Sequence, residues 1–293
     1  MSVENKIEKL KNAIDELAAV VYTTVIKNGV EFYGVCLDNH KNIRPTIYMN
    51  NYLDMIESND DIKGIAEKMI QDLQNINPLE DYNIKEFLNK EYIYNNVIVK
   101  LEKHVKTAEQ VRDSYHSNLF DAVYALDVTD TLPSNKIGNA SVKLTMQMIL
   151  EAQMGPEDID KLKIAAHKNI KKKYGIKFKS MFDVLGKLIS GIPEEEKTNG
   201  MYILTNDKGV NGTALILDNE VMDDICDKLQ TEKLIILPSS IHEVIILKES
   251  EFTKLQDLLQ LVKEVNASQV KPEDQLGDFV MIYNKEIGRE IIR

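Results

Sequence analysis

The stretch KLIILPSSIHEVIILK, residues 233–248, places two short apolar runs on either side of a polar turn. Each run is rich in Ile and Leu and has the length of a strand, too short for an ordinary helix. Pro238 lacks the backbone N–H that a strand ladder needs, so the first strand is expected to end there. The stretch therefore predicts two strands joined by the turn PSSIHE.

This turn carries residue types that also serve nucleophilic catalysis: Ser239, Ser240, His242 and Glu243. Catalysis needs a hydroxyl within hydrogen-bond reach of a base, and a group that orients the base. On a strand, Ser240 and His242 would lie about 7 Å apart at Cα, which is long for a direct hydroxyl-to-imidazole bond. The same residues match Ser-x-x-Glu, in which hydroxyl and carboxylate satisfy the backbone N–H groups of a tight turn. A structural turn is favoured over a ligand-binding turn or a catalytic serine.

The flanking residues extend the stretch into a sheet with helices packed on it. Strands are predicted at MYILT, TALILD, FVMIYN and EIIR, and helices at NEVMDDICDKLQ and EFTKLQDLLQLVKEVN. The loop NDKGVNG, residues 206–212, is interpreted as a hairpin loop between the first two strands, because it lacks the pattern of a phosphate-binding loop and opens no helix. Its backbone N–H groups could still hold an anion, which makes Asn211 a candidate ligand-binding residue.

The N-terminal part mixes helix and strand in the same way. Apolar residues recur at helical spacing over residues 3–19 and 60–75, which predicts two amphipathic helices. Between them, VVYTTVIK and VEFYGVCL flank Asn28 and Gly29, two residues that tolerate the positive φ of a type I′ turn. A hairpin is therefore expected, followed by a short strand at PTIYMN.

The middle of the chain passes from strands to helices. NNVIVKLE and LFDAVYALDVT are predicted strands, and a helical region begins at SVKLTMQMILEAQM. Pro156 opens a new helix with acids in its first turn and lysines at its end, as the helix dipole favours. The chain is therefore expected to be α+β, with mainly antiparallel sheets and packed helices. Two lobes, residues 1–135 and 198–293, are expected to be joined by a helical middle segment, residues 136–197.

The lysine-rich end of that helix, KNIKKKYGIKFK (residues 168–179), is the main basic feature of the sequence. It holds six lysines and no acid, interleaved with Tyr174 and Phe178. Lysines and aromatic rings together can bind a phosphate backbone and stack bases, and the candidate contacts are Lys171, Lys172, Lys173 and Lys177. However, the chain has 47 acidic and 36 basic residues, a net charge of −11, which repels nucleic acid and anionic lipid. A solvated helix end is favoured, and a nucleic-acid or membrane partner is not expected.

Composition also indicates where the chain acts. Cys36 and Cys226 lie in apolar runs without a CxxC neighbour, which is typical of buried thiols in a reducing compartment. The charged N-terminus shows no secretion signal, and no apolar run reaches the roughly 20 residues that span a bilayer. A cytoplasmic protein without a metal or other cofactor is expected.

Arg44, in a loop between strands, is a candidate partner for a ligand carboxylate, although an internal salt bridge is favoured.

Three segments, MYILTN, NGTALIL and above all ILPSSIHEVIIL, resemble a family of bacterial proteins of unknown function from Gram-positive anaerobes. The similarity runs along most of the chain and is densest over residues 200–293. The resemblance implies a bacterial cytoplasmic protein, and it implies no catalytic residues.

The leading functional hypothesis is a soluble, non-enzymatic module that binds a protein or a small molecule, because no recognisable catalytic constellation is present. The first alternative is a hydrolase that uses Ser239 or Ser240 with His242 and Glu243. It requires a serine hydroxyl within hydrogen-bond reach of the His242 ring. The second alternative is nucleic-acid binding through residues 168–179.

Overall fold

The computed structural model describes residues 1–38, 46–75, 88–107, 109–129, 141–185, 200–249 and 254–293. Over these residues the chain is α+β, as expected, and every strand ladder is antiparallel. The chain divides into two compact units, residues 1–84 and 85–293. The boundaries expected near residues 135 and 197 both lie outside the described residues, so the three-part division stays a prediction.

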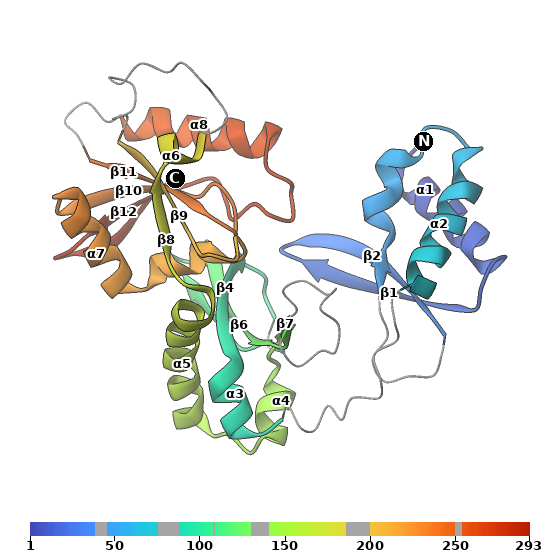
Figure 1. Ribbon diagram of the computed structural model, residues 1–293, viewed down its shortest axis with the longest axis horizontal. Helices are drawn as coiled ribbons and strands as arrows, with labels where there is room; N and C mark the ends of the chain where they lie inside the picture. The colour runs from blue at the N-terminus through green and yellow to red at the C-terminus, as the bar shows by residue number, and fades with distance from the viewer. Residues whose placement is uncertain (39–45, 76–87, 108, 130–140, 186–199, 250–253) are drawn as a thin grey trace. The chain divides into compact units, whose positions relative to one another are not determined.

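The larger unit contains two antiparallel sheets (Figure 1). The four-stranded sheet has the order β4–β6–β5, with β7 also paired to β6, and the six-stranded sheet has the order β13–β12–β10–β11–β9–β8. The strands are β4 (Val97–Lys103), β5 (Arg112–Tyr115), β6 (Phe120–Asp127), β7 (Ser141–Lys143), β8 (Lys177–Ser180), β9 (Met201–Thr205), β10 (Lys233–Leu237), β11 (Val244–Lys248), β12 (Val280–Asn284) and β13 (Gly288–Ile292).

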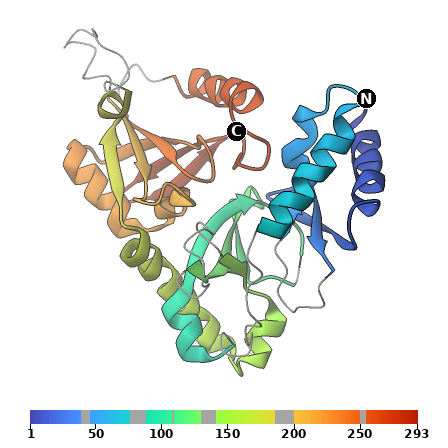
Figure 2. The ribbon, with the colours of Figure 1, turned by 45° about the vertical axis from the view of Figure 1, so that its right-hand side comes forward.

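Helices cover these sheets and connect them. They are α3 (Lys90–Asn96), α4 (Met146–Glu151), α5 (Pro156–Tyr174), α6 (Met181–Leu185), the 3-10 helix η5 (Gly212–Leu217), α7 (Asn219–Leu229) and α8 (Leu255–Ser268). Buried side chains of α7 join one core and those of α8 join another, so the two helices lie on opposite faces of the six-stranded sheet. α5 packs along β4 and leads into β8, so it links the two sheets (Figure 2).

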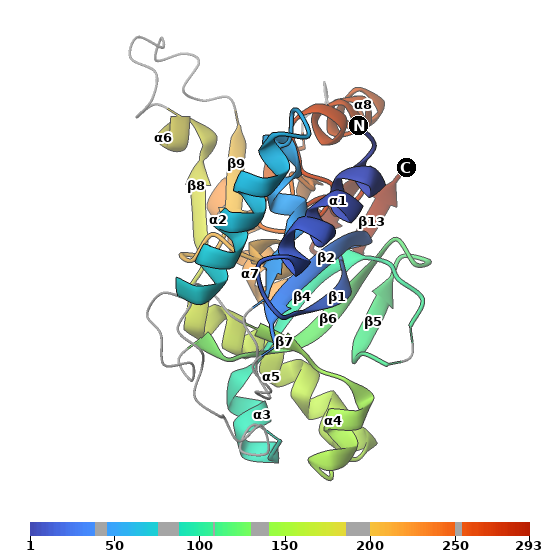
Figure 3. The same cartoon turned by 90° about the vertical axis from the view of Figure 1, so that its right-hand side faces the viewer.

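The smaller unit is a three-stranded sheet with two helices packed on it (Figure 3). Its elements are α1 (Val3–Asp15), β1 (Val20–Lys27), β2 (Val30–Leu37), β3 (Ile47–Tyr48), the 3-10 helix η1 (Met49–Met55) and α2 (Asp61–Asn75). Asn28 and Gly29 have φ angles of 49° and 82°, both positive as the predicted type I′ turn requires. The predicted hairpin is therefore confirmed, with Val20 paired to Leu37 and Lys27 to Val30.

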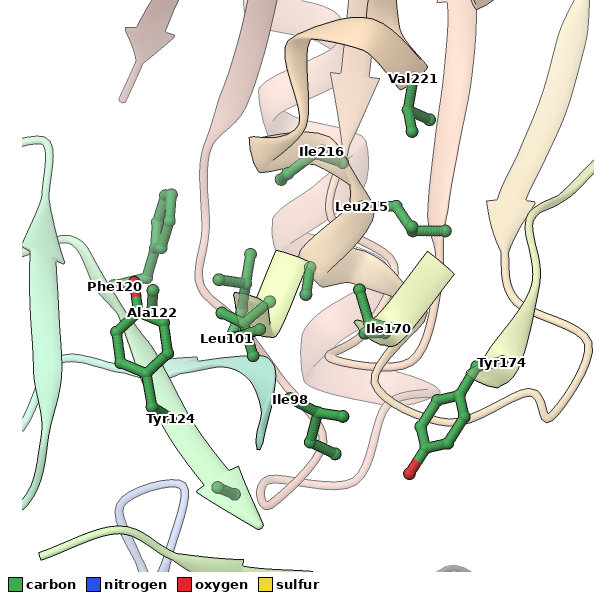
Figure 4. Packing of buried hydrophobic residues seen from close by; sticks show 14 of the residues in the cluster. Ile98, Leu101, Phe120, Ala122, Tyr124, Ile170, Tyr174, Leu215, Ile216 and Val221 are labelled. Atoms are coloured by element: carbon green, nitrogen blue, oxygen red, sulfur yellow. The ribbon is translucent and has the colours of Figure 1, made fainter. Parts of the chain in front are cut away.

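A single hydrophobic core joins both sheets of the larger unit. Figure 4 shows side chains from β4, β6, α5, η5 and α7 meeting in it, among them Leu101, Tyr124, Ile170 and Leu215. β6 is buried along its whole length, because it pairs on both edges and other elements cover its faces. Burying one such aliphatic or aromatic side chain contributes about 1.5–3 kcal/mol. This shared core makes the two sheets one folding unit.

Two predicted elements are wrong in type. TALILD, predicted as a strand, forms the 3-10 helix η5, and SVKLTM, predicted as helical, begins with strand β7. The η5 sequence is a short buried apolar run without alternation of polar and apolar residues, so periodicity does not separate strand from helix there. β7 spans only three residues, too few to show a period. As a result NDKGVNG is no hairpin loop: it leads from β9 into η5 and turns at Asn211, which has a φ of 54°.

Candidate functional site

The PSSIHE turn is held together by the Ser240 side chain. Ser240 Oγ accepts hydrogen bonds from the backbone N–H groups of His242 (3.0 Å) and Glu243 (3.3 Å). The Ser240 N–H donates to the Glu243 carbonyl oxygen at 3.1 Å. Serine commonly stabilises turns in this way. Ser239 and Glu243 are half-buried, and their side chains make no hydrogen bond to another described residue, so of these three side chains only that of Ser240 bonds within the turn.

The His242 ring is occupied on both sides. Its Nδ1 accepts from the Asn211 N–H at 3.2 Å, and its Nε2 lies 3.2 Å from Asp274 Oδ1. Because Nδ1 accepts, the proton of the neutral ring is on Nε2 and is donated to Asp274. Within the described residues no serine hydroxyl bonds to this ring. The hydrolase hypothesis stays a prediction, and this geometry does not support it.

Asn211 and Gly212 bring the 206–212 loop against the turn. The Gly212 N–H donates to the His242 carbonyl oxygen at 3.0 Å, and Thr205 Oγ1 donates to the same oxygen at 2.8 Å. A Cβ on Gly212 would lie 2.6 Å from that oxygen, so only glycine permits this approach. The Asn211 N–H, which the sequence offers as a candidate anion ligand, therefore hydrogen-bonds to the His242 ring of the turn.

A second histidine–carboxylate cluster lies between β4, β5 and β6. The fully buried Asp121 carboxylate accepts from Ser114 Oγ (2.8 Å), Arg112 Nη1 (2.5 Å) and the Val105 N–H (3.2 Å), and lies 2.8 Å from His104 Nδ1. Burial alone would raise the pKa of Asp121, but these hydrogen bonds outweigh it and hold the pKa below its usual value.

This cluster has the residue types of a Ser–His–Asp triad without its geometry. Ser114 Oγ lies 3.3 Å from His104 Nδ1, the same ring nitrogen that contacts Asp121. In a catalytic triad the serine and the aspartate contact opposite nitrogens of the ring. Ser114 donates directly to Asp121 instead. The cluster therefore ties together β5, β6 and the segment after β4, and it offers no activated hydroxyl.

A surface cleft of about 630 Å³ lies between α5 and the junction of η5 with α7. Its lining residues are Ile164, His167, Lys168, Lys171, Leu217, Asp218, Asn219 and Glu220. The four residues from α5 are spaced three and four apart, so they share one face of the helix. The other four come from a region about fifty residues later, which only the fold brings opposite that face.

Lys171 connects the two walls of the cleft. Its Nζ lies 2.7 Å from Asp218 Oδ2 and 2.9 Å from Glu220 Oε2. Asp218 also caps α7, because its side chain accepts from the Val221 N–H at 3.3 Å. Lys168 is exposed at the same cleft and forms no ion pair with a described residue. Lys171 therefore stabilises the fold, whereas Lys168 can contact a ligand.

His167 is a second titratable group that lines the cleft and has no hydrogen-bond partner among the described residues. Its ring is half-buried and makes no hydrogen bond to a described residue. Burial lowers the pKa of His167; Asp218 opposes this effect, while Lys171 and Arg289 add to it. The imidazole is therefore neutral at pH 7 and offers one donor and one acceptor.

Arg289 of β13 supports the α7 wall. Its Nε donates to the Ile216 carbonyl oxygen (2.8 Å) and its Nη1 to Asn219 Oδ1 (2.7 Å), while the guanidinium lies 5.1 Å from the centre of the Tyr283 ring. Its Nη2 is buried and has no hydrogen-bond partner among the described residues. Burial lowers the pKa of Arg289, yet a guanidinium remains charged in proteins. It adds positive charge beside the cleft.

Two of the candidate lysines at the end of α5, Lys171 and Lys173, lie beside carboxylates of the fold. Lys173 donates to Asn96 Oδ1 at 2.8 Å and lies 3.7 Å from Asp127 Oδ2. Lys172 is exposed and Lys177 is half-buried. Because Lys171 and Lys173 both lie beside carboxylates, the positive charge of this helix end is partly neutralised within the fold. Arg44 lies outside the described residues.

Among the described residues, no three His, Cys, Asp or Glu side chains come together in a way that could hold a metal ion. Likewise, none of the helices in the described ranges has the length and apolar character needed to cross a bilayer. Cys36 and Cys226 are free and buried, and burial raises the pKa of Cys226 to about 11.

The chain belongs to a family of unknown function, DUF5688, whose model matches residues 2–285. No curated protein and no solved structure matches it. The family match spans the cleft, the PSSIHE turn and nearly all of both units, so resemblance to a family of unknown function is confirmed. The family brings no assigned site, and the function has to be inferred from the geometry.

Proposed function

We propose that the chain is a non-enzymatic binding module that holds a small organic anion in the cleft between α5 and α7. The observation that carries the proposal is His167, whose ring lines the cleft with both nitrogens unpaired among the described residues. Neither ring nitrogen is closed off from solvent, so water reaches both, and a ligand that hydrogen-bonds to the ring takes the place of that water.

The other lining groups favour an anion attached to an apolar body. Lys168 is available at the cleft, and Lys171 and Arg289 add positive charge. Glu220 is 87% exposed, so its ion pair with Lys171 is weak and can yield to a ligand anion. Leu217 and Ile164 supply apolar surface, and Ile164 is 72% exposed.

The cleft favours binding over covalent chemistry. Among the described residues that line it there is no Ser, Thr or Cys, so none of them places a hydroxyl or thiol nucleophile beside His167. The buried free thiols support a cytoplasmic setting for this module. Nucleic acid is a less favourable ligand, because a net charge of −11 opposes a polyanion far more than a small one.

The test is a thermal-shift and calorimetry series with four probes: inorganic phosphate, phenyl phosphate, benzoate and a single-stranded oligonucleotide. We expect the aromatic anions to bind and to raise Tm, and His167→Ala and Lys168→Gln each to weaken binding about tenfold. Lys172→Gln is the matched control, because Lys172 is exposed on the same helix but does not line the cleft.

Two results would count against this function. If neither aromatic anion binds, or if Lys172→Gln weakens binding as much as Lys168→Gln, the cleft is not the site. Salt-sensitive binding of the oligonucleotide, lost when the lysines of residues 168–179 are neutralised, would support the nucleic-acid hypothesis instead.

A further inference from the structure

β1 lies at the edge of its sheet, and its outer edge has no partner strand among the described residues. The sheet order is β1–β2–β3, so within the described residues β1 (Val20–Lys27) pairs with β2 alone. An unpaired strand edge presents a row of backbone N–H and C=O groups that can accept another strand. This edge does not belong to the cleft described above.

The hairpin register shows which backbone groups point outward. The Asp38 N–H donates to the Ala19 carbonyl oxygen at 3.0 Å, and the same register pairs Val20 with Leu37. In an antiparallel ladder, hydrogen-bonded and non-hydrogen-bonded pairs alternate. Odd-numbered residues of β1 therefore bond to β2, and the N–H and C=O groups of Val20, Tyr22, Thr24 and Ile26 point away from it.

β1 lacks the features that usually block an edge. Residues 18–26 carry no charge, no proline and no glycine, and only Lys27 at the strand end is charged. Val21 is 37% exposed and Ile26 is 60% exposed. The edges of the six-stranded sheet differ: β8 contains Lys177 and Lys179, and β13 contains Arg289 and Glu290. Charged side chains of this kind protect edges from pairing.

We propose that β1 pairs with β1 of a second copy of this chain, giving a two-fold symmetric dimer. Outward-facing residues must stand opposite outward-facing residues, so even-numbered residues pair with even-numbered ones. A register centred on Thr23 satisfies this rule and pairs Val20 with Ile26, Val21 with Val25, Tyr22 with Thr24, and Thr23 with its symmetry mate.

This register favours a second copy over an unrelated peptide because the strand is complementary to itself. The exposed Val21 and Ile26 each face an aliphatic residue across the pair, and β-branched and aromatic cross-strand pairs stabilise sheets. The only charged residue, Lys27, falls outside the paired segment 20–26. Centring the pair on Thr24 would instead set Val21 against Lys27 and Val20 against the turn residue Asn28. The result is an isologous interface with one continuous six-stranded sheet.

The first test measures the mass of the full chain in solution by sedimentation equilibrium over a concentration series. We expect a monomer–dimer equilibrium for the wild type. Thr24→Pro removes an outward N–H without touching the β1–β2 ladder, and proline is tolerated on a free edge. Its dimer Kd should rise at least about tenfold, whereas Thr24→Ala keeps the N–H and should remain dimeric.

The second test reads the register through Thr23. In the proposed dimer two Thr23 residues face each other, so Thr23→Lys and Thr23→Glu should each be monomeric through like-charge repulsion. Mixing the two variants should restore a dimer that contains one chain of each, which native mass spectrometry resolves. Circular dichroism and thermal unfolding establish that each variant is folded.

Three outcomes overturn the proposal. If the wild-type chain stays monomeric at every concentration, the proposed dimer is excluded. A dimer unaffected by Thr24→Pro places the interface elsewhere. If folded Thr23→Lys and Thr23→Glu chains are mixed and form no mixed dimer, the register centred on Thr23 is excluded.

Discussion

Among single residues, Ser240 has the most specific structural role, because its hydroxyl accepts from two backbone N–H groups of the PSSIHE turn. We expect Ser240→Ala to lower the free energy of unfolding by about 1 kcal/mol, as loss of a similar cap does. Urea unfolding measures it. Ser239→Ala is the control and should stay within about 0.5 kcal/mol of the wild type, since Ser239 makes no such bond. Equal effects of the two variants would contradict this role.

Asp121 is the buried charge on which three strands depend. Asp121→Asn leaves Arg112, whose side chain is 9% exposed, without its carboxylate, and breaking a buried ion pair costs about 3–5 kcal/mol. Because the folded pKa of Asp121 is below its usual value, the stability it contributes is complete above about pH 4 and is lost as pH falls further. Urea unfolding between pH 3 and 7 should show a smaller acid loss for Asp121→Asn. If Asp121→Asn loses as much stability at acid pH as the wild type, Asp121 is not the cause of that loss.

His167 should make ligand binding depend on pH. Its pKa is lowered in the folded protein, chiefly by burial; an anion beside the ring would raise it again, so binding takes up a proton. We therefore expect the affinity for benzoate, whose charge is constant in this range, to increase as pH falls below about 6.5. Calorimetry in buffers of different ionisation heat measures the proton uptake. In His167→Gln the pH dependence of benzoate binding should disappear. If it persists, the proton taken up on binding goes to a group other than His167.

At the scale of elements, the β1–β2 hairpin depends on its two-residue turn. Gly29 has a φ of 82°, a conformation that costs an L-residue about 1–2 kcal/mol. We expect Gly29→Ala to destabilise the smaller unit by that amount in urea unfolding. Gly64→Ala is the matched control in the same unit: Gly64 lies inside α2 with open space around it, so alanine should stabilise by up to about 1 kcal/mol. A stabilising Gly29→Ala would contradict the turn assignment.

α5 shows how one helix can serve both the core and the surface. Leu162, Ala166, Ile170 and Tyr174 face the core, while the face that begins at Ile164 lines the cleft. The helix begins at Pro156, after a glycine whose N–H donates to Asp158 Oδ2 at 2.9 Å, and ends before Gly175, which has a φ of 73°. These local signals position the cleft residues before any ligand is present.

At the scale of the whole molecule, the shared core decides which part of the chain folds alone. The core includes residues of β4 and β6 as well as of β10 and β12, so both sheets depend on it. We expect a fragment of residues 85–293 to unfold cooperatively in urea, and a fragment of residues 198–293 to lack a cooperative transition. A cooperative transition in the shorter fragment would support the division near residue 197 that the sequence suggests.

Local sequence signals correctly predicted most elements of the fold. The apolar spacing of α1 and α2, the Asn28–Gly29 turn, the Pro156 helix start and the strands on either side of PSSIHE all appear as expected. Each depends on interactions between residues close in the chain, such as side-chain periodicity, caps and positive φ angles. η5 and β7 are the exceptions. The sequence of η5 is a buried apolar run, which looks alike as strand or helix until its neighbours are known.

The candidate site could not be predicted from the sequence in the same way. Lys168 stood out only as a member of the lysine-rich segment 168–179, and His167 lies just before that segment. Asn219 and Glu220 are the first residues of the predicted helix NEVMDDICDKLQ. Their common cleft depends on α5 packing along β4 while η5 enters the same core. The sequence by itself determined most of the secondary structure and the α+β class, because those follow from short-range physics. Only the tertiary structure decided which side chains meet, since contacts across fifty residues depend on how a whole core closes.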